Sequence, residues 1–369
     1  MRVGIPKEIK DHEYRVGLTP ASVADVIGEG HEVIVQTRAG ENAGFPDAEY
    51  VGVGAHIADN AEEVFGRADM IVKIKEPQPQ ECKMLHSGQI LFTFLHLAPD
   101  PRQAEALLAS DAIAVAYETV TDTTGKLPIL TPMSEIAGRM SIQVAAHFLE
   151  KAHGGEGLLL GGVPGVKAGK VVILGAGVAG TNALQIAVGL GANVTMINRS
   201  LPPLRSLDAL YRGRVQTRLS AKSQIQEEIL DADVVVGAVL VPGGAAPRLV
   251  SRDLVKRMKP QSVVVDIAVD QGGCFDTSRP TSHSEPIYVV DEVIHYCVTN
   301  MPGAVPKTST LALNNATLPF VLELANRGPE QAFEVDPHLR NGLDIYRGVV
   351  AHPIVARDLG LPYEKPNFG

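Results

Sequence analysis

Short apolar runs rich in strand-forming residues alternate with segments of helical spacing along this chain. In its first third, five runs are expected to be strands: residues 2–5, 32–36, 70–75, 89–96 and 112–118. Helix-like spacing lies between them, at residues 20–29 and 101–110. Strands of a parallel sheet are buried on both faces and are joined by helices, so the pattern predicts a parallel sheet covered by helices.

A second series of the same kind starts at Lys170. Its six expected strands, enough for a second doubly wound sheet, are residues 171–174, 193–197, 215–218, 233–241, 262–269 and 287–290. Between the two series, an apolar stripe through Ile136, Met140, Val144 and Phe148 predicts one long helix over residues 132–153. A glycine-rich loop is expected at 154–169, and a helix at 308–327 is expected to return the chain to the first domain.

These elements predict an α/β protein of two Rossmann-like, doubly wound domains joined by a long helix, with a discontinuous first domain. The expected boundaries give a substrate-binding and catalytic domain at residues 1–130 and 305–369, and a dinucleotide-binding domain at residues 131–304. A chain of 369 residues is too long for one ordinary core, which agrees with two domains.

Composition narrows the range of partners. The net charge is −9 and no basic tract offsets it, which argues against nucleic acid or an anionic membrane as a partner. The chain has no run of about 18 apolar residues, and its start lacks an apolar signal region. Cys82, Cys274 and Cys297 are widely spaced, so neither a disulfide framework nor a thiolate metal site is expected. These features predict a protein of the cytoplasm.

The segment KVVILGAGVAG, residues 170–180, combines a strand with glycines at the spacing of a dinucleotide-binding turn. Gly175 permits the tight turn, Gly177 lets the backbone approach a pyrophosphate, and Gly180 lets the next helix pack closely on its strand. The helix amides that follow, at Val178 and Ala179, are expected to face the phosphates. An expected helix at 181–190 and a second strand follow within about 30 residues, which makes a chance match improbable.

The position after that second strand usually carries an acid that binds the ribose hydroxyls and repels a 2′-phosphate. Here it is Asn198, followed by Arg199 and Ser200. An amide does not repel a phosphate, while a guanidinium and a hydroxyl can bind one. The expected cofactor is therefore NAD with NADP accepted as well, unless Arg199 is only a solvated loop residue.

Four polar residues stand where an open α/β sheet binds ligands, at strand ends or in loops: Arg15, Lys75, His96 and Asp270. Arg15 offers a fork for a carboxylate, although it could be a surface charge, and Lys75 could simply end its strand in water. Asp270 could cap the turn that follows it. His96 follows a long apolar run and is expected to be buried, where both ring nitrogens need partners. Together the four suit hydride transfer to a small keto acid.

Other chemistries find no support in the sequence. No Walker loop, GxSxG elbow, HExxH motif or paired Cys/His set is present. Glu323 and Arg327 have the spacing of a salt bridge, so no metal site is expected.

Over essentially its whole length the chain resembles the alanine dehydrogenases, a family related to the nicotinamide nucleotide transhydrogenase domain. The matching runs are MRVGIPKE, EYRVGLTP, VKIKEPQ, GQILFTFLHLA, PMSEIAGRM, GGVPGV, GAVLVPGG, VDIAVDQGG and NMPGAVPKTST. The resemblance implies the reversible oxidative deamination of L-alanine to pyruvate and ammonium with a nicotinamide cofactor, in a homohexamer.

The resemblance also implies roles for single residues. Arg15 and Lys75 would hold the carboxylate and carbonyl of the substrate, while His96 and Asp270 would serve acid–base steps. Met133 would line the methyl pocket. The remaining residues would line the cofactor cleft, with Asn300 also near the substrate: Ser134, Ser220, Val239, Leu240, Ile267, Arg279, Val298, Asn300 and Met301.

The chain departs from this family at the cofactor position. Family members usually have an aspartate in place of Asn198 and a small or apolar residue in place of Arg199; the strand end here instead resembles NADP-dependent shikimate-type dehydrogenases. Two other functions stay open. One is a dehydrogenase for a longer, lysine-derived substrate of the saccharopine type, which the bulk of Leu130 and Met133 disfavours. The other is a nucleotide-sensing or transhydrogenase-like subunit, which would not need His96 and Lys75 together.

Overall fold

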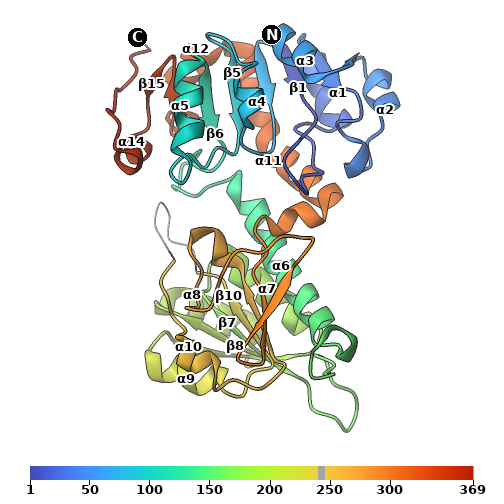
Figure 1. Cartoon of the computed structure of the whole chain (residues 1–369), viewed down its shortest axis with the longest axis vertical. Helices are drawn as coiled ribbons and strands as arrows, with labels where there is room; N and C mark the ends of the chain where they lie inside the picture. The colour runs from blue at the N-terminus through green and yellow to red at the C-terminus, as the bar shows by residue number, and fades with distance from the viewer. Residues whose placement is uncertain (240–245, 369) are drawn as a thin grey trace. The chain divides into compact units, whose positions relative to one another are not determined.

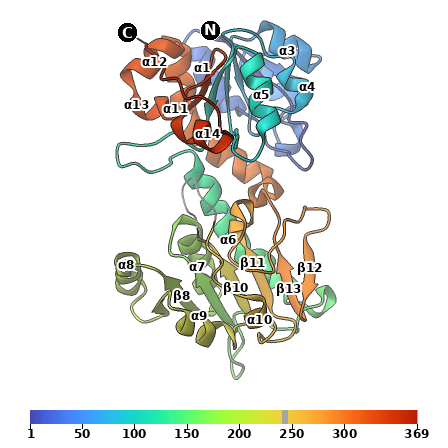
Figure 2. The same cartoon turned by 60° about the vertical axis from the view of Figure 1, so that its left-hand side comes forward.

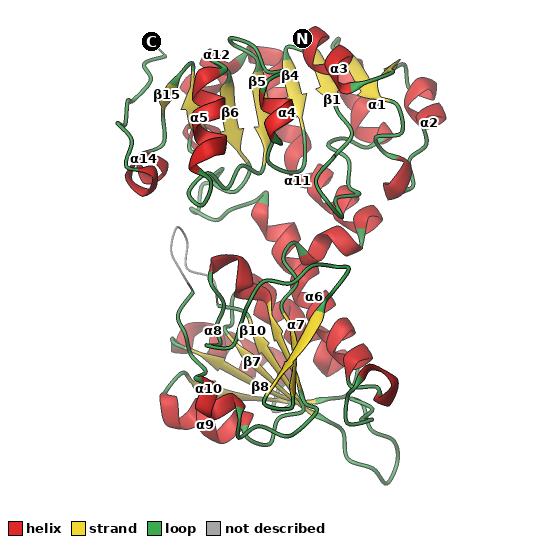
Figure 3. Ribbon diagram, in the orientation of Figure 1, coloured by secondary structure: helices red, strands yellow, loops and turns green. Residues whose placement is uncertain are grey.

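The computed structural model describes residues 1–239 and 246–368, which form two compact units (Figure 1). Unit 1 comprises Met1–Met133 and Gly303–Gly369, and unit 2 comprises Ser134–Pro302. Helix α6 (Leu130–Phe148) begins in unit 1 and continues into unit 2. Each unit is built on a largely parallel sheet with interleaved helices, which confirms the predicted fold class of two Rossmann-like units with a discontinuous first one (Figure 3).

Unit 1 contains an eight-stranded sheet in the order β15-β14-β6-β5-β4-β1-β2-β3. Its strands are β1 (Arg2–Ile5), β2 (Glu32–Gln36), β3 (His56–Ala58), β4 (Met70–Val72), β5 (Ile90–Thr93), β6 (Ile113–Ala116), β14 (Leu343–Tyr346) and β15 (Val349–Val350). Strands β1 to β6 are parallel to their neighbours, whereas β14 runs antiparallel to β6 and β15 antiparallel to β14.

The helices of unit 1 cover both faces of this sheet (Figure 2). They are α1 (Pro20–Gly28), α2 (Asp47–Gly52), α3 (Ala61–Arg67), α4 (Pro79–Cys82), α5 (Pro101–Ala109), α11 (Pro306–Arg327), α12 (Pro329–Val335), α13 (Pro337–Arg340) and α14 (Pro353–Leu359). Phe65 of α3, Cys82 of α4 and Leu107 of α5 pack on the strand residues Ile71 and Leu91 in one core. Helices α1 and α11 contact each other on the opposite face (Figure 2).

Proline begins many of these helices, and the reason is local. A proline at the first helical position has its φ already set, and its missing N–H would have had no partner there. In α1, Pro20 follows the N-cap residue Thr19, whose hydroxyl accepts a hydrogen bond from the amide of Ser22 at 3.2 Å. In α5, Pro101 follows Asp100, which caps the helix in the same way.

Unit 2 contains a seven-stranded sheet in the order β12-β13-β11-β10-β7-β8-β9. Its strands are β7 (Lys170–Leu174), β8 (Asn193–Asn198), β9 (Val215–Leu219), β10 (Val234–Gly237), β11 (Val263–Asp266), β12 (Ile287–Val290) and β13 (Val293–Tyr296). Its helices are α7 (Val178–Gly189), α8 (Leu201–Tyr211), α9 (Lys222–Ile229) and α10 (Arg252–Val255). Ile229 of α9 and Val255 of α10 pack against one face of the sheet, and α7 contacts β7, β8 and β10.

Several predicted elements need correction. The sixth parallel strand of unit 2 is β13, which the sequence analysis missed, and β12 is an antiparallel edge strand. In unit 1, the analysis missed β3, β14 and β15, which are short and stand outside the longer apolar runs that indicated β4, β5 and β6. The predicted runs 70–75, 89–96 and 112–118 are longer than their strands, because buried loop residues such as Ile74, Leu95 and Tyr117 continue the apolar pattern. The long helix ends at Phe148 and not at His153.

The predicted assignment of the substrate to unit 1 and of the dinucleotide to unit 2 remains a prediction. Among the described helices, none combines the length and the apolar character needed to cross a bilayer.

Candidate functional site

The turn between β7 and α7 has the geometry that a pyrophosphate-binding loop requires. Gly175 has a φ of +105°, a conformation that side chains disfavour. A Cβ on Gly180 would lie 1.8 Å from the carbonyl oxygen of Gly175, so only glycine lets α7 start this close to the strand. Gly177 is the exposed N-cap residue of α7, and a Cβ added there would meet no atom within 4 Å. The amides of Val178 and Ala179 therefore begin a helix beside an open position, where amide donors and the helix dipole stabilise a phosphate.

Asn198 is the last residue of β8, and its side chain forms a hydrogen bond with the glycine loop. Its Oδ1 accepts a hydrogen bond from the amide of Ala176 at 3.1 Å, and its Nδ2 donates to the carbonyl and hydroxyl oxygens of Ser200 at 3.0 and 3.2 Å. Its own carbonyl accepts from the amide of Ser220 at 3.0 Å. Arg199 is exposed and forms no hydrogen bond or ion pair with the residues that the structure describes. Residues 198–200 thus present an amide, a guanidinium and a hydroxyl, and no carboxylate.

Two carboxylates lie at the carboxyl end of β11, in different surroundings: Asp266 is the last residue of the strand and Asp270 follows it. Asp266 is buried and accepts hydrogen bonds from the amides of Ala268 and Cys274 at 3.1 and 2.7 Å and from the hydroxyl of Ser278 at 2.5 Å. Burial raises the pKa of Asp266 despite these donors. Asp270 is exposed in the 3-10 turn η3 (Ile267–Gln271) and has no hydrogen-bond partner within the described part of the chain. The turn η3 is therefore capped by Asp266, and the carboxylate of Asp270 is exposed.

The other residues expected at the cofactor lie in unit 2, and most of them follow the carboxyl end of a parallel strand. Ser220 follows β9, Val239 follows β10, Ile267 follows β11, and Val298, Asn300 and Met301 follow β13. Carboxyl ends of parallel strands share one edge of a sheet, which is the edge where such folds bind ligands. Two of the expected residues do not follow a parallel strand. Ser134 is in α6, and Arg279 lies before β12, where its guanidinium stacks 4.0 Å from the ring centroid of Tyr288. Leu240 lies outside the described residues.

Arg15, in unit 1, is 2% exposed and is therefore not a surface charge. Its Nε and Nη2 pair with the carboxylate of Glu13 at 2.7 and 2.5 Å, and its Nη1 lies 3.1 Å from the sulfur of Met133. A buried guanidinium needs such a partner, because an unpaired charge is costly away from water. The pairing holds the guanidinium beside Met133, the residue expected at the methyl pocket.

Lys75 lies three residues beyond the end of β4 and is half-buried. Its Nζ is 6.0 Å from the ring centroid of Phe94, and no described residue accepts a hydrogen bond from it. Burial, together with the charge of Arg15, lowers the pKa of Lys75. This shift brings the ammonium group closer to the range in which it can exchange a proton with a substrate.

The prediction that His96 is buried is wrong. Its side chain is 46% exposed, because β5 ends at Thr93 and the backbone of His96 adopts a left-handed φ of +48°. The carboxylate of Glu118 accepts hydrogen bonds from the amides of Leu95 and His96 at 3.2 and 2.6 Å, and it lies 3.6 Å from the Nδ1 of His96. The imidazole stacks on Phe94 with ring centroids 5.7 Å apart. The ring is thus held by its backbone and by Phe94, with one face available to a ligand.

The charge of Glu118 acts on a second carboxyl group. Asp344 of β14 is 1% exposed, and its Oδ1 has no hydrogen-bond partner among the described residues. Burial and the charge of Glu118 raise the pKa of Asp344 well above its usual range, which favours the protonated form of Asp344.

Glu13, Glu118, Asp266 and Asp344 were all missed by the sequence analysis. Glu118 had a usable signal, because it ends the apolar run 112–118 as the other candidates end theirs. Glu13 and Asp344 carry no such signal: one acts from a loop before Arg15, and the other from a strand more than 200 residues away from Glu118 in sequence.

Comparison with protein families covers nearly the whole chain. The model described as "Alanine dehydrogenase/PNT, N-terminal domain" matches residues 4–137, and the model described as "Alanine dehydrogenase/PNT, C-terminal domain" matches residues 141–353.

Individual relatives agree with this result. The chain is 52% identical over 363 residues to a protein of Halomonas elongata named alanine dehydrogenase, with 98% of each chain covered. It is 50% identical over 366 residues to a Mycobacterium tuberculosis protein of the same name, with 99% of each chain covered.

Two solved structures resemble the present one at different distances. A structure titled L-alanine dehydrogenase superposes with a TM-score of 0.95 at 50% identity, covering 98% of this chain and 99% of the other. A transhydrogenase from Sinorhizobium meliloti gives a TM-score of 0.81 at 27% identity, covering 96% and 99%.

Proposed function

The chain belongs to the alanine dehydrogenase/PNT family, and from this membership we propose that it catalyses the reversible oxidative deamination of L-alanine to pyruvate and ammonium. One observation carries the proposal: the chain aligns over nearly its full length, at 52% identity, with a protein named alanine dehydrogenase. The surroundings of Arg15, Lys75 and His96 support it, because they combine a buried cation, a lysine of lowered pKa and an accessible imidazole.

Unit 1 supplies groups suited to a small 2-keto acid. Arg15 binds the substrate carboxylate, and Lys75 donates a hydrogen bond to the keto oxygen and polarises the carbonyl. His96 exchanges the proton at that oxygen, and Asp270 of unit 2 serves the acid–base steps around the carbinolamine. Met133, beside Arg15, limits the substrate side chain to a methyl group.

Unit 2 fits a nicotinamide dinucleotide. The open position at Gly177 and the amides that follow suit the pyrophosphate, and Asn198 lies where the adenosine ribose is bound in such folds. A bound nicotinamide ring supplies the hydride donor or acceptor for the reaction. We propose that NADP(H) is used alongside NAD(H), because residues 198–200 hold no carboxylate to repel a 2′-phosphate and Arg199 has no competing ion pair among the described residues.

Substitution of the unit 1 residues tests the chemistry. His96→Ala and Lys75→Ala are each expected to lower turnover by about 10²-fold or more while NADH binding is retained. The exposed residues His86 and Lys83 provide matched controls, since His86→Ala and Lys83→Ala should leave turnover unchanged. Near-normal turnover in either active-site variant would remove that residue from the mechanism.

Asp270→Asn tests the remaining carboxylate. The substitution keeps the shape of an exposed side chain, so the protein should fold normally while activity falls. An unchanged activity and pH profile would show that Asp270 has no part in proton transfer.

Cofactor selectivity is tested by Asn198→Asp. A carboxylate at this position would repel a 2′-phosphate, so NADPH-dependent kcat/KM is expected to fall by roughly tenfold or more, equivalent to about 1.4 kcal/mol, while NADH use is kept or improved. If the starting protein already ignores NADPH, or if the NADPH/NADH ratio does not change, Arg199 is only a solvated loop residue.

A second candidate function rests on the 27% identity to a transhydrogenase. In that case the chain would bind nucleotide without oxidising alanine, and purified protein would give no alanine-dependent NAD(P)H.

We also propose a homohexamer located in the cytoplasm, in line with the family resemblance. Exposed apolar side chains at Leu159, Val163, Val166 and Leu190 offer surface for such an assembly. Light scattering of the purified protein gives the number of chains.

A further inference from the structure

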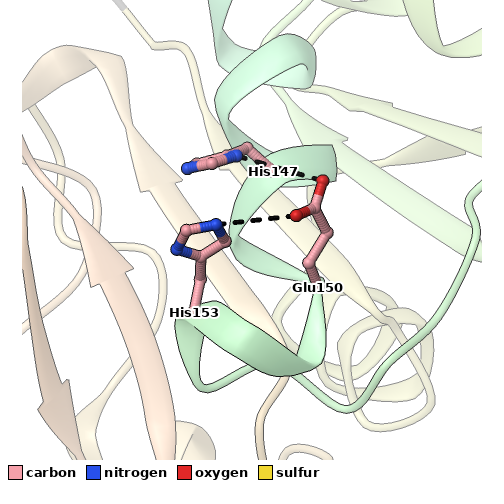
Figure 4. A group of neighbouring side chains, drawn as sticks. All are labelled: His147, Glu150 and His153. Atoms are coloured by element: carbon pink, nitrogen blue, oxygen red, sulfur yellow. Dashed lines mark ion pairs between the residues drawn. The ribbon is translucent and has the colours of Figure 1, made fainter.

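A compact group of three metal-ligating side chains lies where α6 ends (Figure 4). His147 is in the last turn of α6, Glu150 follows the helix, and His153 ends the 3-10 turn η2 (Lys151–His153). One ligand atom from each lies within 4.8 Å of the other two. We propose that His147, Glu150 and His153 bind a divalent transition-metal ion of the zinc type, through two imidazole nitrogens and one carboxylate oxygen.

The distances are close to those of a metal complex. The Nε2 of His153 lies 3.5 Å from one carboxylate oxygen of Glu150, and the Nδ1 of His147 lies 4.0 Å from the other. Ligand atoms about 2.1 Å from a tetrahedral ion are about 3.4 Å apart, so the first pair already has the required separation. The second pair is about 0.6 Å too far apart and involves the other carboxylate oxygen, so His147 and Glu150, whose side chains are 51% and 59% exposed, must rotate to bring His147 to the oxygen that faces His153.

The backbone that carries the three ligands is fixed in advance. The carbonyl of Glu150 accepts hydrogen bonds from the amides of His153 and Gly155 at 3.0 and 3.2 Å. Gly154 has a φ of +92°, and a Cβ on Gly155 would lie 2.3 Å from the carbonyl oxygen of Phe148. Glycine at both positions therefore permits the turn that returns His153 toward His147.

The ring of Phe148 packs against both imidazoles. It is 9% exposed, and its ring centroid lies 5.1 Å from that of His147 and 6.1 Å from that of His153. The two imidazole centroids are 3.8 Å apart. Lys151, the cation nearest in sequence, donates to Gln261 at 3.0 Å and forms no ion pair with Glu150 in the described part of the chain.

The donor set selects the class of ion. Imidazole suits zinc, cobalt, nickel and copper, whereas magnesium and calcium prefer sites made wholly of oxygen. Three protein ligands leave one tetrahedral position for water. The dipole of α6 adds to the attraction, since the helix ends in partial negative charge beside His147.

This site is separate from the candidate cofactor residues of the same unit. Lys151 contacts Gln261, which precedes β11, so the cluster lies near the amino end of that strand. The cofactor residues follow the carboxyl ends of the strands instead. A bound ion would tie the end of α6 to the segment that leads into β7, and would stabilise unit 2 without entering the reaction. The sequence analysis missed the cluster because its ligands are spaced three residues apart, and this spacing differs from that of HExxH and of paired Cys/His sets.

Cobalt titration tests the proposal on the full-length protein after chelator treatment and removal of the chelator. Co²⁺ should produce visible ligand-field absorption that saturates at one ion per chain and disappears when Zn²⁺ is added. His147→Gln and His153→Gln should each weaken Co²⁺ binding by at least about tenfold, and Zn²⁺ should raise the unfolding temperature of the parent protein but not that of these two variants. His86→Gln, at an exposed histidine in unit 1, should bind as the parent does.

Equal binding by the parent and both cluster variants, loss of binding in His86→Gln, or absence of binding by the parent would each overturn the proposal. A thiolate charge-transfer band would do the same, because it would place the ion at a cysteine. Should a histidine variant fail to fold, Glu150→Gln, which keeps the side-chain size at a 59% exposed position, gives the same comparison.

Discussion

Gly180→Ala is expected to damage dinucleotide binding, and the structure sets the size of the effect. The added Cβ would lie 1.8 Å from the carbonyl oxygen of Gly175, whereas real Cβ contacts essentially never fall below 3.0 Å. The start of α7 or the glycine turn must therefore move by the difference, about 1.2 Å. A displacement of that size breaks a hydrogen bond between a helix amide and a phosphate. One charge-assisted bond is worth about 1.5–3 kcal/mol, so NADH binding should weaken by about 10- to 150-fold.

The same helix provides the control. Gly189 is the last residue of α7, and a Cβ there would meet no atom within 4 Å. Gly189→Ala should therefore bind NADH normally, and it should gain up to about 1 kcal/mol of stability because alanine favours a helix.

Fluorescence titration with NADH gives the dissociation constant of each variant, and thermal unfolding gives its stability. If Gly180→Ala binds NADH as tightly as Gly189→Ala, with an unchanged unfolding temperature, the close approach of α7 to its strand is not what shapes the phosphate site.

Three further predictions concern ionisation. Burial lowers the pKa of Lys75 below its unfolded value of about 10.4, so between the two pKa values the unfolded chain binds more protons and stability rises with pH. Unfolding of Lys75→Met, measured at several pH values, should lack this rise, and the variant should be more stable than the parent at neutral pH. Burial raises the pKa of Asp344, so the folded state binds more protons than the unfolded state above about pH 3.9 and stability falls as pH rises. The stability of Asp344→Asn should not show this decrease. An unchanged pH dependence in the variant would show that the pKa of Asp344 is not raised by folding. Burial raises the pKa of Cys82 to about 11 and that of Cys274 to about 12, so a thiol reagent should modify neither until the protein unfolds, and rapid labelling of native protein would contradict their burial.

Sequence patterns predicted the fold class because parallel strands buried on both faces leave long apolar runs. The same feature blurred the strand ends, since Ile74, Leu95 and Tyr117 are buried outside the strands and extend those runs. Strands β3, β14 and β15 escaped notice because they are two to four residues long and no longer apolar run surrounds them, unlike the equally short β4, β5 and β6.

Site prediction followed a similar division. The glycines of the β7–α7 turn were found because their roles depend on local backbone geometry, which sequence spacing records. The exposure of His96 depends on where β5 ends, and its backbone is held by Glu118, which lies beyond the end of β6 and whose charge acts on Asp344 of β14. Contacts of that kind between distant segments leave no periodic mark in a single sequence.

Initial rates with pyruvate and ammonium, measured separately with NADH and with NADPH, decide whether this chain is an alanine dehydrogenase with relaxed cofactor selectivity. We expect oxidation of both cofactors that requires pyruvate and ammonium together and ceases when either is omitted. Absence of ammonium-dependent oxidation with both cofactors would contradict the proposed reaction, and oxidation of NADH alone would contradict the role given to Asn198 and Arg199.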